Sequence, residues 1–152
     1  MRRIAATLLT VCALGFTSFA QGANPLVGTW ERFSTTDAKG QPAQPQPPAA
    51  FLVMTANGYF SQIAVPRGRP KVDKPLMDMT KEELVARFAD VIARRGSYSV
   101  EGNRLTRRDI VHTDPSTEGT DAVQTFRIEG DVLILGSTDP ANKTENRFRR
   151  VK

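Results

Sequence analysis

Hydrophobic and polar positions alternate in short runs along most of the chain, and glycine-containing turns separate the runs. This pattern is typical of an antiparallel all-β domain, because alternate side chains of a strand face opposite sides of a sheet. It predicts eight strands, at residues 26–35, 50–56, 59–65, 96–100, 104–112, 120–129, 132–136 and 144–151. Three pairs of neighbours are joined by short turns at Asn57-Gly58, Gly102-Asn103 and Gly130-Asp131. Successive hairpins of this kind predict an up-and-down meander.

One segment has helical periodicity instead. Thr80 and Glu83 form a capping-box pair ahead of four apolar residues at helical spacing, Leu84, Val85, Phe88 and Ile92. We therefore predict one helix over residues 81–94 that packs its apolar side onto the sheet.

Two connections interrupt the rhythm of the strands. Residues 41–48 read QPAQPQPP, and because proline has no backbone N–H we expect an extended, solvated loop that can serve as a lid. Residues 66–75 carry four basic side chains, which is typical of a solvated loop. The functional alternative is attraction for an anionic ligand or an anionic membrane surface.

The N-terminus has the pattern of an export signal. Met1-Arg2-Arg3 precedes an apolar run at residues 4–16, and Ser18-Phe19-Ala20 resembles a cleavage site, with Ala23 as the second choice. The apolar run is too short to span a membrane. We predict a signal peptide over residues 1–20, a single barrel domain over residues 26–152, and a periplasmic or secreted protein.

Composition and net charge limit the kinds of partner that we expect the protein to bind. Cleavage would remove the single cysteine, which suits an oxidising compartment, and would leave 132 of the 152 residues, enough for one domain with a core. It would also leave 19 of the 21 basic residues against 16 acidic ones, a net charge of +3. This modest charge and the export signal argue against a nucleic-acid partner.

The first and last predicted strands carry a signature of barrel closure. A tryptophan in the triplet Gly28-Thr29-Trp30 and an arginine of the strand Arg147-Phe148-Arg149-Arg150 can meet only where a barrel closes, with the guanidinium stacked on the indole. Arg147 and Arg149 share one face of the last strand, so either is expected to be the stacking partner. Trp30 is expected to plug the closed end, with Gly28 beside it.

Motifs across nearly the whole domain follow in the order and spacing of a known family: Leu26, Gly28-Thr29-Trp30, Ser34, Gly58-Tyr59-Phe60-Ser61, residues 96–102, Pro115, Gly119, residues 128–133 and Phe148-Arg149-Arg150. The chain resembles the bacterial lipocalin-like domain family, as a divergent member. The resemblance implies a calycin-type β-barrel and a binding role. The family's histidine pair falls on Arg107 and Arg108, and an expected arginine falls on Gln124, so no family site residue carries over.

Few residues offer chemistry. His112 is the only histidine, and we favour a hydrogen-bonded histidine at a strand end over a haem ligand. We therefore predict no catalytic residue, no metal site and no cofactor. Arg107 and Asp109 share a strand face, whereas His112 faces the other way unless a bulge intervenes. Two alternatives stay open for the pair: an inward ion pair, with Arg107 anchoring a ligand carboxylate, or the somewhat favoured solvated face.

The leading functional prediction is an exported, monomeric barrel that binds a small apolar or weakly anionic molecule inside. The candidate ligand-binding residues are Phe51, Val53, Tyr59, Ile63, Tyr98, Arg107 and Gln124. One alternative is an enzyme for isomerisation or cyclisation that uses Tyr59, Tyr98 or Asp109 as acid or base. The other is a side-chain-filled barrel that acts through surface contacts. No nucleic acid and no stable membrane insertion are expected.

Overall fold

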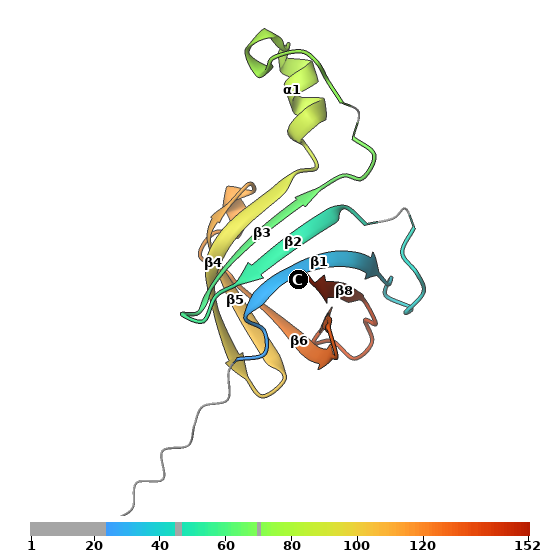
Figure 1. Ribbon diagram of the computed structural model, residues 1–152, viewed down its shortest axis with the longest axis vertical. Helices are drawn as coiled ribbons and strands as arrows, with labels where there is room; N and C mark the ends of the chain where they lie inside the picture. The colour runs from blue at the N-terminus through green and yellow to red at the C-terminus, as the bar shows by residue number, and fades with distance from the viewer. Residues whose placement is uncertain (1–23, 45–46, 70) are drawn as a thin grey trace, which may run out of the picture.

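A closed β-barrel forms the body of the protein, and the computed structural model describes residues 24–44, 47–69 and 71–152. The strands are β1 (Gly28–Thr35), β2 (Ala49–Met54), β3 (Tyr59–Val65), β4 (Ile92–Glu101), β5 (Arg104–His112), β6 (Asp121–Glu129), β7 (Val132–Gly136) and β8 (Glu145–Arg150). Each strand pairs antiparallel with its neighbours in sequence, and β8 pairs with β1 (Figure 1). The predicted eight-stranded up-and-down barrel is confirmed. The predicted signal peptide lies outside the described residues.

Helix α1 (Lys81–Phe88) is shorter than predicted. The capping box of Thr80 and Glu83 starts it as expected, but the helix ends at Phe88 and residues from Ile92 onward belong to β4. Pairing of Ile92 with Ala64 of β3 explains the early end, because the hydrogen bonds of the sheet replace those of further helical turns.

The predicted packing of α1 onto the sheet is wrong. None of its residues is buried, and Val85 is 57% exposed. The helix and the short 3-10 turn η1 (Leu76–Asp78) form an arm that projects beyond one end of the barrel (Figure 1). The sheet therefore gains no cover from the helix, and α1 contributes no side chain to the core.

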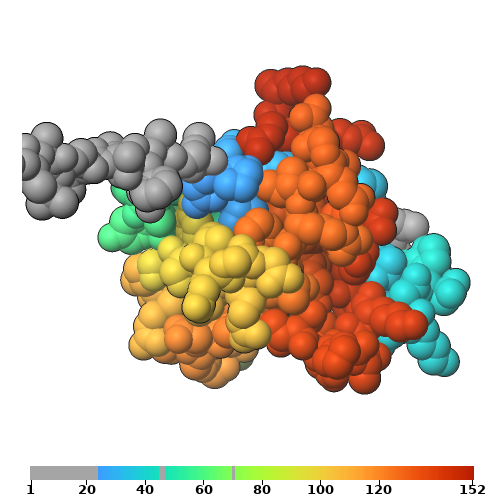
Figure 2. Space-filling view, turned by 90° about the horizontal axis from the view of Figure 1, so that it is seen from below, coloured from blue at the N-terminus to red at the C-terminus, as the bar shows by residue number. Residues whose placement is uncertain are grey.

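The apolar core fills the half of the barrel remote from the arm. Its largest fully buried side chains are Trp30, Phe60, Leu26, Leu52, Met54, Leu105, Leu133 and Leu135. Seen from this end, the β4–β5 hairpin (yellow) and the strands that follow it (orange) form one continuous surface (Figure 2). This half of the barrel is closed by its own side chains.

Four of the candidate ligand-binding residues lie on the outer face of the barrel instead of inside it. Their side chains are 39–48% exposed: Phe51, Val53, Tyr59 and Ile63. The alternate residues Leu52, Met54 and Phe60 are the buried ones. Because strand side chains alternate between faces, an error of one position in the inward set reverses the whole prediction.

Trp30 closes the barrel as expected, but its partner is Arg150. The indole is fully buried and its Nε1 donates to the carbonyl of Leu26 at 2.8 Å. The Arg150 guanidinium carbon lies 4.1 Å from the ring centroid. Gly28 lies beside it at φ 142°, a backbone conformation that residues with a Cβ rarely adopt, and a Cβ there would also displace Nη1 of Arg150.

The prediction of Arg147 or Arg149 as the stacking partner is wrong for a reason of register. Trp30 pairs directly with Arg150 across β1 and β8, and Arg150 shares the inward face of β8 with the buried Phe148. Arg149 points outward, 5.0 Å from the ring centroid of Phe33. Phe33 lies three residues after Trp30, so strand alternation alone places it on the opposite, outward face. The expected irregularity of β1 is present as a register shift between Arg32 and Ser34.

Replacing Trp30 tests the closure of the barrel. We expect Trp30→Ala to lower the free energy of unfolding by about 3–5 kcal/mol, because it leaves a cavity and removes the stacked partner of Arg150. Chemical denaturation measures the change. Phe33→Ala is the matched control on the same strand, since Phe33 is 38% exposed and its loss is expected to be about 1 kcal/mol or less. A loss below 1 kcal/mol for Trp30→Ala would contradict the closure argument.

Candidate functional site

The half of the barrel nearer the arm contains a polar cavity of about 220 Å³, which we call the cup. Its polar lining comes from six strands: Arg32, Gln62, Arg94, Arg107, His112, Gln124 and Asn146. Leu135 and Phe148, each 2% exposed, connect the cup to the apolar core. The interior thus changes from apolar to polar along the barrel axis.

Gln62 holds two guanidinium groups together. Its Oε1 accepts hydrogen bonds from Nε and Nη2 of Arg94, at 3.1 and 2.7 Å, and from Nη1 of Arg107 at 3.0 Å. Both guanidinium carbons also lie over the ring of Phe60, 5.8 and 5.4 Å from its centroid. Two like charges are therefore kept close by a shared acceptor and a shared aromatic face.

The predicted residues Arg107 and Gln124 do meet in the cup. Nη2 of Arg107 donates to Oε1 of Gln124 across β5 and β6. Arg107 is 5% and Asp109 6% exposed, so both point inward and the solvated alternative for this pair is wrong. The ion pair itself differs from the prediction, because Oδ2 of Asp109 lies 3.7 Å from Nη1 of Arg94.

The buried charges of the cup are unbalanced. Asp109 is the one carboxylate within ion-pair range of Arg94 or Arg107 among the described residues. Burial, and then the neighbouring Arg94, lower the pKa of Arg107 to about 9, while Asp109 opposes the shift. Arg107 is therefore still charged at neutral pH. Its Nε, and Oδ1 of Asp109, have no hydrogen-bond partner in the described part of the chain.

A bulge in β5 brings His112 to the same cavity. Asp109 pairs with Gly96 and Val111 with Arg95, so Ile110 is the extra residue. The insertion returns His112 to the inward face, which is the exception that the parity argument allowed. The backbone N–H of Asp114 donates to Nδ1 of His112 at 2.8 Å. In the neutral ring this places the proton on Nε2.

Arg32 lies at the mouth of the cup. Its Nε and Nη2 donate to the carbonyl of Pro48, at 3.2 and 2.7 Å, and its Nη1 donates to Oδ1 of Asn146 at 3.2 Å. Burial, followed by the nearby charge of Arg67, lowers the pKa of Arg32. The end of the proline-rich segment is thereby fixed to the barrel rim.

The remaining predicted site residues lie elsewhere. Tyr98 is buried in the closed half, where its hydroxyl donates to the carbonyl of Thr55 at 2.7 Å and accepts from Nδ2 of Asn24 at 3.1 Å. Tyr59 is on the outer face. The three proposed acids or bases of the enzyme alternative therefore do not share a site. Within the described ranges, no three His, Cys, Asp or Glu side chains gather as a metal site.

Sequence reasoning missed Gln62 and Arg94, which organise the cup. Gln62 shares the inward face of β3 with Phe60 and Ala64, and that alternation was a usable signal. Arg94 was hidden by its assignment to the helix. Once β4 begins at Ile92, Arg94 follows the same inward parity as the buried Tyr98.

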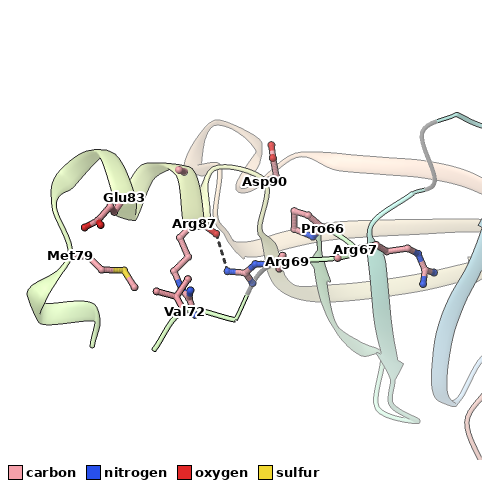
Figure 3. Close-up of a pocket in the computed structure, with 10 residues that line it drawn as sticks. Pro66, Arg67, Arg69, Val72, Met79, Glu83, Arg87 and Asp90 are labelled. Carbon is pink, nitrogen blue, oxygen red and sulfur yellow. Dashed lines mark hydrogen bonds between the residues drawn. The ribbon is translucent and has the colours of Figure 1, made fainter. Parts of the chain in front are cut away.

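A separate hollow of about 430 Å³ lies in the arm, between α1 and the segment that follows β3 (Figure 3). Val72, Met79 and Ala86 contribute its apolar surface, and Nη2 of Arg69 donates to the carbonyl of Arg87 at 2.9 Å. None of its lining residues is buried. It therefore lacks the desolvated charges that make the cup the stronger candidate.

A closed, up-and-down antiparallel barrel of eight strands with a cavity at one end defines the calycin-type class of β-barrel proteins. Residues 27–151 of the chain match the model of the family described as lipocalin-like domain. The chain belongs to this family. Among its described residues, no helix has the length and apolar character needed to cross a bilayer.

The chain is similar to solved structures at low sequence identity. A lipocalin-like protein from Bacteroides uniformis is 17% identical, with a TM-score of 0.50 over 83% of this chain and 98% of the other. An uncharacterized protein from Bacteroides eggerthii is 10% identical, with a TM-score of 0.49 over 83% and 99%. Secretory abundant heat soluble protein 4 from Ramazzottius varieornatus is 12% identical, with a TM-score of 0.39 over 84% and 96%. No curated protein matches the chain.

The close approach of β4 to β5 at the bulge yields a second prediction. A Cβ on Gly96 would overlap the backbone carbonyl of Arg108, and a backbone group yields less readily than a side chain. We expect Gly96→Ala to lower the free energy of unfolding by about 1–3 kcal/mol. Ser99→Ala, at an exposed site on the same strand, should change it by less than about 0.5 kcal/mol. Urea denaturation compares the two, and equal stabilities would contradict the tight register.

Proposed function

We propose that the protein binds a small molecule by placing an anionic group in the cup. The observation that carries this proposal is the pair of the half-buried Arg94 and the buried Arg107, with a single carboxylate, Asp109, beside it. A desolvated charge without a counter-ion is unfavourable, and a ligand anion would compensate it. The free Nε of Arg107 offers a further donor. Guanidinium groups match the geometry of carboxylates.

The volume of the cup limits the ligand. A cavity of about 220 Å³ is smaller than the roughly 300–1,000 Å³ of pockets that enclose a drug-sized molecule. The ligand is therefore small, or part of it lies outside. We also propose that the protein acts as a monomer, which the closed barrel supports because closure leaves no free strand edge for pairing with a second copy.

Neighbouring arginines of β5 provide a matched test. Arg107 faces the cup, whereas Arg108 is exposed and pairs with Asp121 at 3.0 Å. We expect Arg107→Gln to weaken binding of hexanoate, measured by isothermal titration calorimetry, about 10- to 100-fold, because a charged hydrogen bond contributes about 1.5–3 kcal/mol. Arg108→Gln should leave the affinity unchanged.

Two results would contradict the proposal. One is no detectable binding of hexanoate, or an equal loss in both variants, which would indicate attraction to surface charge alone. The other concerns protein that is purified gently and measured by native mass spectrometry: release of a neutral molecule from it on denaturation would contradict the proposal. An anionic molecule released in stoichiometric amount would support the proposal and identify its class.

We further propose that the protein acts outside the cytoplasm, as the N-terminal pattern of basic, apolar and small residues supports. The mass of the protein in the exported fraction is expected to correspond to a chain that starts at Gln21, or at Asn24 for the second cleavage site. Intact-mass spectrometry of cell fractions measures where the chain starts and which fraction contains it. A chain that retains Met1 and stays in the cytoplasmic fraction would contradict export.

A further inference from the structure

A further hollow, of about 570 Å³, lies where α1 leads into β4 and shares two lining residues with the cup. One side of this outer hollow is formed by Phe88, Ala89, Val91 and Ile92, where α1 leads into β4, and the other by residues 112–114, at the end of β5. Ile92 and His112 also line the cup. The two hollows are therefore adjacent.

The outer hollow presents apolar surface that the barrel does not cover. Phe88 is 46% and Ile92 41% exposed, although both are large hydrocarbon side chains. On the inner side, by contrast, the cup ends at Leu135 and Phe148 in the packed core. Space for an apolar group next to the arginine pair thus lies toward the outside.

We infer that the ligand is an amphiphilic monocarboxylate whose carboxylate occupies the cup and whose hydrocarbon part binds outside the barrel, in the outer hollow. This inference rests on the proposed function and specifies the ligand class of the same site. It reverses the arrangement expected from the sequence, in which apolar walls inside the barrel hold the ligand. Burial of hydrocarbon against Phe88 and Ile92 then adds to the affinity that the arginines supply.

The charges of the two hollows fix the orientation of such a ligand. Asp114 lies in the outer hollow, where its Oδ1 accepts hydrogen bonds from the backbone N–H and the hydroxyl of Ser116. A second carboxylate beside Asp114 is repelled, whereas one beside Arg94 and Arg107 is attracted. The head of the ligand accordingly prefers the cup, and the chain prefers the outer hollow.

A series of acetate, butyrate, hexanoate and octanoate tests the inference by titration calorimetry. The affinity is expected to rise about two- to fourfold for each added methylene that becomes buried. Phe88→Ser should remove most of this gain while leaving the affinity for acetate unchanged. Val85→Ser is the matched control, because Val85 lies one turn earlier on α1, is 57% exposed and does not line the outer hollow.

Intermolecular nuclear Overhauser effects locate the chain directly. Contacts from the terminal methyl of octanoate to the Phe88 ring support the inference, and contacts to Leu135 or Phe148 overturn it. The inference also fails, while the proposed function stands, if acetate binds but the affinity does not grow with chain length, or grows equally in Phe88→Ser. If neither acetate nor octanoate binds, both fail.

Discussion

The stacking of Arg150 on Trp30 joins the last strand of the barrel to the first. The same guanidinium donates to the carbonyls of Val27 and Pro25, at 2.8 and 2.9 Å, so it also fixes the segment that enters the barrel. Closure decides which side chains of every strand face inward. The cup exists because this parity places Gln62, Arg94 and Arg107 inward on three successive strands, where one amide oxygen can serve both guanidinium groups.

The polar half of the interior opposes stability. Two guanidinium groups near one carboxylate lose more hydration than a single ion pair recovers, and well-packed hydrocarbon at these positions is often as stable or more so. Phe60 offsets part of this cost by lying beneath both cations. The fold itself does not require the charges, since the other half of the same barrel is filled with apolar side chains. A binding role accounts for residues that packing alone does not explain.

Local patterns predicted the strands well, because alternation and glycine turns are short-range signals: the bounds of β3, β5 and β7 agree with the prediction. Features set by pairing between distant segments were harder to predict. The inward face of β2 is Leu52 and Met54 rather than Phe51 and Val53, a choice that register decides. Arg107 and Gln124 were predicted as site residues, but Arg94 was not. The apolar spacing typical of a helix continues to Ile92, and only the pairing of Ile92 with β3 shows that the helix has ended before it.

The exposed and the inward-facing arginines would contribute differently to the proposed binding. Arg67 and Arg149 are exposed, so salt at physiological strength screens them beyond about 8 Å, and their effect falls on the rate of encounter with an anion. Arg94 and Arg107 are removed from water and screened much less. Asp109 already pairs with Arg94, which leaves Arg107 as the charge that a ligand neutralises. In the proposed complex, contact with Arg107 would therefore govern how long an anion stays, while the exposed arginines would govern how fast it arrives.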